Sequence, residues 1–287
     1  MDSSKTSIYV PDKTSTEEAL HRTTHLAIGA HSDDLEIFAF HGIATCYRQT
    51  DRWFGGVTVT DGAGCPGKGE RSEDEIERIK AVRFREQNKA ANIGKYSFQC
   101  QMGYTSDAVK DYGASRALVT TLTDILDQSS PEVLYLHNPF DKHTTHLAVL
   151  QRCIEALRNL SRDRRPQQVF GCEVWRGLDW LRNADKIILH TDQNLRLARK
   201  LIKVFRSQIA DAKNYVQATL GRRCANATYF DSHSVDQVSS CSYAVDLSPL
   251  LEDDEMTLQA FVGQHLDRFS NDVLSALEPL TSKPEHP

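Results

Sequence analysis

The 287-residue sequence contains no long hydrophobic run. No stretch approaches the roughly 20 apolar residues that cross a bilayer, and the polar start from Met1 to Glu18 lacks the apolar region of a signal peptide. We therefore expect a cytoplasmic protein without a membrane partner. Basic residues are not concentrated in any segment and the net charge is -5, so nucleic acid is not an expected partner either.

Several common binding motifs are also missing. The seven cysteines are widely spaced and form no C-x-x-C pair, which excludes a zinc ribbon and a thioredoxin-like motif. The glycine-rich stretch Asp61–Gly69 matches neither G-x-G-x-x-G nor the phosphate-binding G-x-x-x-x-G-K-[ST] pattern. It is either a flexible connection or a loop that faces a substrate. No repeat or low-complexity linker is visible, which favours one domain over residues 25–287 after a lead-in of residues 1–24.

Apolar runs alternate with segments of helical periodicity along most of the chain. Predicted strands lie at 26–30, 53–60, 96–102, 132–137 and 168–175, and predicted helices at 34–50, 72–94, 115–128, 143–157, 194–220 and 256–277. The helix at 72 starts with a Ser-x-x-Glu capping box. This alternation predicts an α/β fold, with a mostly parallel sheet covered by helices on both faces.

The first predicted strand, Leu26–Ala30, runs into a cluster of charge. His31, Asp33, Asp34 and Glu36 place one imidazole and three carboxylates where the strand ends and a helix begins. Three acids so close together repel one another, and a bound cation is the simplest compensation. Imidazole and carboxylate ligands suit zinc or a related divalent metal, so we expect a metal site here.

A similar cluster follows the strand at 132–137. His143 and His146 lie three residues apart at a helix start, so both imidazoles project from one face. If the two strands are neighbours, their carboxyl ends bring these histidines to His31 and Asp34. The two clusters then complete a single site.

These residues provide a plausible hydrolytic centre. Zinc in hydrolases takes three protein ligands, which His31, Asp34 and His146 supply. Asp33 then remains to accept a proton from the attacking water. Protonated His143 remains to stabilise the oxyanion and to protonate the departing amine.

Each of these residues also has a simpler interpretation. Many His-x-x-His pairs such as His143 and His146 are surface residues, and Asp34 could be a helix cap. Glu36 fits a supporting role, and Asp141 either orients an imidazole or caps the next helix. The joint occurrence of both clusters after strands favours the metal site.

Ala30–Glu36 and Asp141–His146 together resemble the LmbE/PIG-L family of zinc-dependent N-acetylglucosaminyl deacetylases, with its A-H-P-D-D-x-E and D-x-H-x-D-H patterns. The similarity continues through Thr60–Gly64, Arg83–Gly94 and Ser207–Gln208, and covers most of residues 25–230. This resemblance implies a Rossmann-like three-layer sandwich. It also implies removal of an N-acetyl group from glucosamine-containing compounds.

The resemblance implies the same roles for the two clusters, with His31, Asp34 and His146 as zinc ligands, Asp33 as general base and His143 as general acid or oxyanion partner. It further suggests substrate contacts at Arg83 and Asp107. Arg83 also fits an exposed helical ion pair with Glu86.

The chain departs from the family pattern at two positions. Ser32 replaces the usual proline, which removes no ligand. Thr145 replaces the usual aspartate, so a carboxylate that raises the pKa of His143 is absent.

The sequence thus predicts a zinc-dependent hydrolase that releases acetate and a free amine from a small N-acetylglucosamine-containing molecule. Another divalent metal is an alternative cofactor. Alternative functions are an amidase for a related amide, such as an N-acylated metabolite or antibiotic intermediate, and a sugar-binding relative that has lost catalysis. Substrate selection is expected from residues 62–71, 104–112 and the segment after Trp175. The lead-in and the C-terminal helix are candidate contacts in a homo-oligomer.

Overall fold

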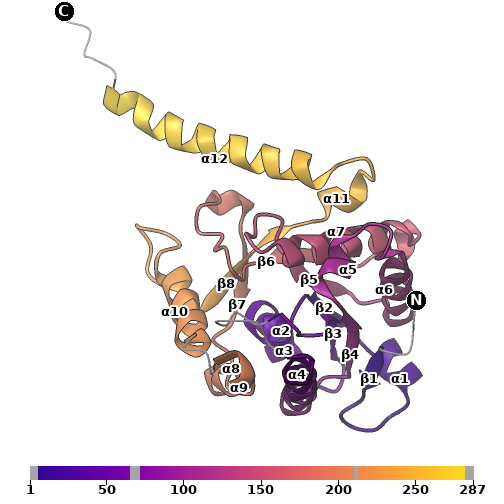
Figure 1. Cartoon of the computed structure of the whole chain (residues 1–287). Helices are drawn as coiled ribbons and strands as arrows, with labels where there is room; N and C mark the ends of the chain where they lie inside the picture. Colours follow the sequence, from indigo (N-terminus) through magenta and orange to yellow (C-terminus); the bar gives the residue numbers. More distant parts are fainter. Residues whose placement is uncertain (1–5, 65–71, 210–212, 282–287) are drawn as a thin grey trace, which may run out of the picture.

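The computed structural model describes residues 6–64, 72–209 and 213–281, and these form an eight-stranded sheet with helices on both faces (Figure 1). The strand order is β1-β4-β3-β2-β5-β6-β8-β7. The strands are β1 (Ser7–Tyr9), β2 (His25–Gly29), β3 (Phe54–Thr60), β4 (Phe98–Tyr104), β5 (Val133–His137), β6 (Gln168–Cys172), β7 (Ile187–His190) and β8 (Cys241–Asp246). The helices are α1 (Thr16–His21), α2 (Asp34–Phe38), α3 (Phe40–Cys46), α4 (Glu73–Gly94), α5 (Ser106–Lys110), α6 (Arg116–Ser129), α7 (Thr144–Arg158), α8 (Leu195–Ile202), α9 (Arg206–Ile209), α10 (Tyr215–Thr228), α11 (Pro249–Glu252) and α12 (Leu258–Thr281).

The centre of the sheet is parallel and its edges are antiparallel. Strands β4, β3, β2, β5 and β6 run in one direction, whereas β1 pairs antiparallel with β4 and β8 pairs antiparallel with β6 and β7. The prediction of a mostly parallel α/β sandwich is therefore confirmed. The chain passes from β2 towards β4 on one side and later from β5 to β6 on the other. The carboxyl ends of β2 and β5 consequently flank the crevice where such sheets bind ligands.

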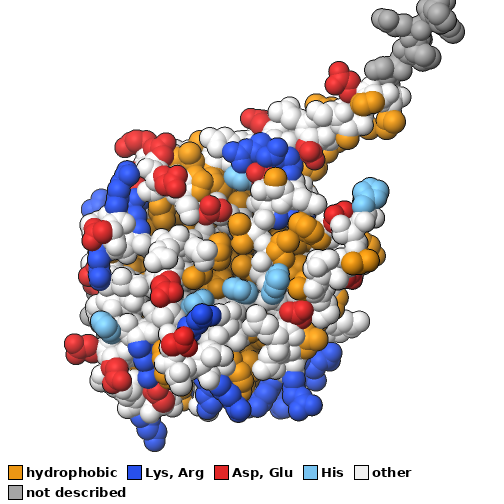
Figure 2. All heavy atoms as spheres, turned by 180° about the vertical axis from the view of Figure 1, so that it is seen from behind, with side chains coloured by type: hydrophobic (Ala, Val, Ile, Leu, Met, Phe, Trp, Pro, Cys, Tyr) orange, Lys and Arg blue, Asp and Glu red, His pale blue; other side chains and the backbone are white. Residues whose placement is uncertain are grey.

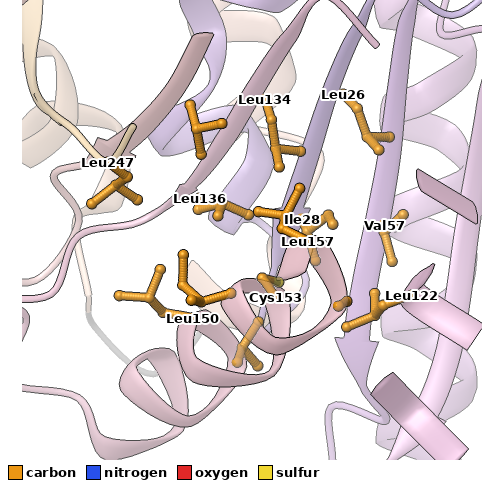
Figure 3. Close-up of a cluster of buried hydrophobic side chains, with 14 of the residues drawn as sticks. Leu26, Ile28, Val57, Leu122, Leu134, Leu136, Leu150, Cys153, Leu157 and Leu247 are labelled. Atoms are coloured by element: carbon orange, nitrogen blue, oxygen red, sulfur yellow. The ribbon is translucent and has the colours of Figure 1, made fainter. Parts of the chain in front are cut away.

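The central strands read as continuous apolar runs because both of their faces are buried. Figure 3 shows Leu26, Ile28, Leu134 and Leu136 of β2 and β5 in a cluster with side chains of α6 and α7. Intervening residues such as Ala27 belong to a second cluster on the other face, which contains side chains of α2, α3, α4 and α8. These two layers fix β2 and β5 in position.

Two predicted helices are broken in the structure. The segment 34–50 divides at Ala39 into α2 and α3. The predicted helix over 194–220 is wrong, because the chain forms α8, α9 and α10 instead. Val204 and Phe205, directly after α8, are both buried. If α8 continued as an amphipathic helix, it would direct one of these two side chains away from the core. Asn214 then caps α10, which continues through Gly221 to Thr228, since one glycine costs a helix only about 1 kcal/mol.

The remaining elements lie outside the parallel centre, at the two sides of the sheet and in a projecting C-terminal helix. Strand β8 was not among the predicted elements, while β1 and α1 of the lead-in pack at the other edge of the sheet. Helix α12 projects from the body, with hydrophobic side chains along its exposed part (Figures 1 and 2). Within the described ranges, every helix is too short or too polar to cross a bilayer. The division into a lead-in and one domain stays a prediction.

Candidate active site

The turn after β2 carries the first half of the site. Gly29 ends the strand under the turn, where an added Cβ would lie 3.0 Å from Asp34 Cβ and from Leu35 Cδ2. Asp33 has a φ of 83°, a left-handed backbone that few residues other than glycine adopt. Asp34 begins α2 and its Oδ2 accepts the backbone N–H of His31 at 2.7 Å. Because Asp34 caps no helical N–H group in this way, the cap interpretation is wrong.

Three donor atoms from the two clusters converge at the carboxyl ends of β2 and β5. His31 Nδ1 lies 3.4 Å from Asp34 Oδ2 and 3.1 Å from His146 Nε2, and His146 Nε2 lies 3.5 Å from Asp34 Oδ2. Tetrahedral zinc with ligands at about 2.0–2.2 Å holds its donors roughly 3.3–3.6 Å apart. This arrangement of two imidazole nitrogens and a carboxylate oxygen therefore fits a divalent cation.

Asp141 orients His146 within this set. Asp141 Oδ2 lies 3.1 Å from His146 Nδ1, and Oδ1 accepts the backbone N–H of His143 at 3.2 Å. Donation from Nδ1 leaves the lone pair of His146 Nε2 directed at the donor set. Of the two interpretations for Asp141, the structure places it where it orients an imidazole.

The sequence interpretation missed His137, the last residue of β5. Its ring stacks on His146 with centroids 3.8 Å apart, and its Nε2 lies 3.4 Å from Asp34 Oδ2. His137 Nε2 also accepts the backbone N–H of Ala30 at 2.9 Å, so its lone pair is already engaged. The signal that was available is its position at the end of the strand that leads to His143. His137 packs beside the three donors and ties β5 to the turn after β2.

A network of buried polar side chains binds the backbone of Asp33. Gln87 Oε1 accepts the backbone N–H of Asp33 at 3.4 Å, and Gln87 Nε2 donates to Glu36 at 3.0 Å. Glu36 is fully buried and also accepts the Tyr96 hydroxyl at 2.8 Å, in keeping with the supporting role expected for it. These bonds hold the turn in its left-handed conformation.

The two predicted proton-transfer groups have shifted pKa values. Burial, together with the carboxylates of Asp34 and Glu36, raises the pKa of Asp33, whereas Arg83 lowers it. Burial and the neighbouring His31 lower the pKa of His143, despite the attraction of Asp34 and Asp141. Threonine at position 145 adds no further carboxylate that would offset this decrease.

A cavity of about 700 Å³ opens beside the donor set. Its wall includes His31, Asp33, Asp34 and His143, so the predicted catalytic residues face a space of ligand size. Segments after β4 and β6 also contribute, through Ser106 and through Glu173, Val174 and Trp175. Residues 65–71, part of the loop that we expected to select the substrate, lie outside the described residues.

Arg83 lines this cavity, but Asp107 does not. Arg83 is 1% exposed and donates to the carbonyls of Gly62 at 2.5 Å and Gly64 at 2.9 Å, so it fixes the loop after β3. The exposed ion-pair interpretation is wrong, since Glu86 instead accepts from the Ser207 hydroxyl at 2.5 Å. Asp107 has a 98% exposed side chain beside Lys110 and is absent from the cavity wall.

Helix α10 and the residues before it form the wall that sequence reasoning did not identify. The cavity-lining residues of this wall are Lys213, Asn214, Tyr215, Ala218, Thr219, Arg222 and Arg223. Gln208 of α9 connects the wall to the catalytic turn, because its Nε2 donates to Ser32 O at 3.1 Å and its Oε1 accepts from Arg83 at 3.0 Å. No local motif marks these residues, whose position depends on how the 194–228 segment breaks into three helices.

Comparisons with solved structures agree with this fold. N,N'-diacetylchitobiose deacetylase from Pyrococcus horikoshii is 18% identical, with 85% of this chain and 90% of that chain covered and a TM-score of 0.58. The A40926 pseudoaglycone deacetylase Dbv21 is 17% identical, with 78% of this chain and 97% of that chain covered and a TM-score of 0.56. GalB, the 4-carboxy-2-hydroxymuconate hydratase of Pseudomonas putida KT2440, is 17% identical, with 78% of this chain and 96% of that chain covered and a TM-score of 0.59. At such identities these likenesses establish the architecture.

A similarity to a known family comes from the sequence of the central region. No curated protein matches the chain. Residues 26–157 match the model of PIG-L, the GlcNAc-PI de-N-acetylase family. The matched segment runs from β2 to α7 and includes both clusters that meet at the cavity. The central region of the chain, residues 26–157, is therefore similar to the PIG-L family.

Proposed function

We propose that this protein is a zinc-dependent N-deacetylase that hydrolyses the acetamide of a small N-acetylglucosamine-containing molecule and releases acetate and a free amine. The observation that carries the proposal is the convergence of His31 Nδ1, Asp34 Oδ2 and His146 Nε2 at the edge of a cavity that Asp33 and His143 also line. The match of residues 26–157 to the PIG-L family model supports the reaction class.

The donor chemistry supports the choice of metal. Two imidazoles and one carboxylate form a set of three protein ligands typical of catalytic zinc, with a further position for water or substrate. In this role His31, Asp34 and His146 hold the cation, which supplies Lewis-acid chemistry for amide hydrolysis. Asp141 fixes the tautomer of His146 and so keeps a lone pair available.

The remaining two residues handle protons. Asp33 accepts a proton from the attacking water, and the raised pKa of its carboxyl makes it a stronger base. Protonated His143 donates a proton to the amine nitrogen as the C–N bond breaks. The lowered pKa of His143 makes it a stronger acid but reduces the protonated fraction near neutral pH. Turnover requires deprotonated Asp33 and protonated His143 together, so we expect a bell-shaped pH profile that falls on both sides of its optimum.

The surroundings accommodate a substrate larger than the acetamide alone. A volume of about 700 Å³ is within the range of ligand cavities, and the indole of Trp175 offers a flat apolar surface in its wall. We place the reaction in the cytoplasm, a setting in keeping with free thiols at the cysteines of the described residues. Cys65 lies outside those residues.

The direct test is acetate release from N-acetylglucosamine by purified protein with zinc. Asp33→Asn retains the shape of the side chain and tolerates a left-handed backbone, so the variant is expected to keep its metal while turnover falls by about 10²-fold or more. Asp124→Asn removes an exposed carboxylate on α6 and serves as the matched control. Full activity of Asp33→Asn would reject Asp33 as the base, and a lack of acetate release across N-acetylated amino sugars would reject the function.

A further inference from the structure

The α10 side of the cavity carries positive charge. Lys213, Arg222 and Arg223 line it, and Glu173 at the end of β6 is the carboxylate on the same side. Lys213 Nζ lies 5.0 Å from the centre of the Trp175 ring, and Arg222 donates to the backbone carbonyl of Val174. Arg223 differs from both because it is almost completely buried.

Arg223 uses only one of its three guanidinium nitrogens. Nη2 donates to Glu36 O at 3.2 Å and to Ile37 O at 2.7 Å, while the guanidinium lies over the Phe40 ring at 4.9 Å. Nε and Nη1 have no hydrogen-bond partner among the described residues. Arg223 lines the cavity but is only 2% exposed, so two donors of a charged group are enclosed next to the cavity without a partner among the described residues.

Such an arrangement is unfavourable without a ligand. An unsatisfied buried donor costs about 1–3 kcal/mol, and more when the group is charged. Burial lowers the pKa of Arg223 to about 10, which leaves the guanidinium protonated at neutral pH. The free donors are therefore cationic and require an acceptor.

The described residues do not provide that acceptor. Glu173 is the neighbouring carboxylate, but its Oε1 accepts from Asn226 Nδ2 at 2.5 Å and from Tyr243 N at 3.0 Å, and its Oε2 accepts from Leu178 N at 3.1 Å. Glu173 thus supplies attraction at a distance while its oxygens serve other donors. No acceptor among the described residues reaches Nε or Nη1, and the cavity that Arg223 lines is the space from which a ligand would supply one.

We propose that Arg223 forms a second binding point in the active-site cavity, where its guanidinium holds an acidic group on the part of the substrate that leaves as the amine. The inference rests on the proposed deacetylase function. Lys213 and Arg222 add attraction on the same wall, and charge-assisted bonds to an arginine are the strong ones. Arg223 then sets which amides bind productively, while the donor set and Asp33 carry out the hydrolysis.

The test compares three probes that share the acetamide. N-acetylglucosamine is neutral, N-acetylmuramic acid adds a carboxylate, and N-acetylglucosamine 6-phosphate adds a phosphate. We expect kcat/KM of the wild-type protein to be about 10-fold to 100-fold higher for at least one acidic probe than for the neutral one. The two acidic probes distinguish a carboxylate ligand from a phosphate.

Two variants isolate the side chain. Arg223→Met is expected to remove the preference for the acidic probe, mainly through KM, and Arg223→Lys to restore part of it. Arg196→Gln removes an exposed charge on α8 and is expected to retain the full preference. Since Arg223 also holds the carbonyls of Glu36 and Ile37, a purely structural role would lower kcat for all three probes equally. An unchanged ratio of acidic to neutral probe in Arg223→Met would overturn the proposal.

Binding separates this inference from the deacetylase function. The corresponding amines, glucosamine, muramic acid and glucosamine 6-phosphate, are titrated calorimetrically into wild-type protein and Arg223→Met. A preference for an acidic amine that is lost in the variant supports the binding point even if no probe releases acetate. Equal binding of all three amines to the wild-type protein overturns it.

Discussion

Two groups of histidines lie at opposite ends of the same part of the sheet, and they differ in their partners. At the carboxyl ends of β2 and β5, the rings of His31, His137, His143 and His146 surround Asp34. Towards the amino end of β2, His25 Nδ1 lies 3.0 Å from the Thr24 hydroxyl, and His41 Nδ1 lies 2.8 Å from the Tyr135 hydroxyl. In the described part of the chain, no carboxylate forms an ion pair with His25 or His41.

This difference shows what turns buried imidazoles into a donor set. Burial lowers the pKa of both His25 and His41 to about 4, so these rings are neutral and bond to hydroxyl groups. At the other end, Asp34 contributes an oxygen to the donor set and Asp141 orients His146. The same residue type is structural in one place and a candidate ligand in the other because the carboxylates are placed asymmetrically.

The largest expected effect comes from removing the central carboxylate. Asp34→Ala is predicted to weaken zinc binding by more than about 100-fold, which exceeds the effect typical of an outer-shell residue. His41→Asn is predicted to bind zinc as the wild-type protein does. Calorimetric titration with zinc and elemental analysis of the purified variants measure this. Tight zinc binding by Asp34→Ala would contradict the proposed ligand set.

Asp141→Asn sharpens the comparison, because it removes the orienting charge but no ligand. An asparagine oxygen still accepts a hydrogen bond from His146 Nδ1, so the ring stays in place while its basicity decreases. Zinc affinity is predicted to fall by about 10-fold to 100-fold. The same titration detects the change, and an affinity equal to that of the wild-type protein would exclude Asp141 from tuning the site.

His25 and His41, the histidines without a carboxylate partner among the described residues, are expected to make the stability of the fold sensitive to acid. Below pH 6.5 the unfolded chain protonates His25 and His41, whereas the folded protein resists protonation at these sites until about pH 4. The unfolded state therefore binds more protons, and the free energy of unfolding falls as the pH decreases through this window. Urea denaturation at pH 7, 6 and 5 measures the slope. His41→Asn is predicted to reduce it by up to about 1.4 kcal/mol per pH unit, and an unchanged slope would show that His41 titrates normally.

The smallest effect on activity is expected from a substitution of Asp107, the residue for which the sequence suggested a substrate contact. Its side chain is exposed and does not line the cavity, so Asp107→Ala is predicted to change kcat/KM for N-acetylglucosamine by less than about twofold, as is usual for surface positions. Steady-state acetate release provides the measurement. A tenfold loss would show that the segment after β4 reaches the substrate.

The positions in the fold that could be predicted best from the sequence are those of residues that follow strands. The apolar runs before His31 and before His143 placed both clusters at strand ends, and the pairing of β2 with β5 then brought them together. The α10 wall and His137 were not found, since their places depend on contacts between distant segments. Strand β8 was missed for the same reason, because it packs antiparallel against β6 rather than continuing the alternation. Asp107 was expected near the substrate because it follows β4, but the sequence does not show which way α5 directs this side chain.

The span between His31 and His146 also determines when the site can form. Their donor atoms are 3.1 Å apart in space but 115 residues apart in the chain. Closing so long a loop is slow compared with forming local helices. During synthesis, the chain has to extend past His146, near the start of α7, before the donor set can assemble. A growing chain that ends at β4 is consequently expected to be inert, however well its own turn after β2 is folded.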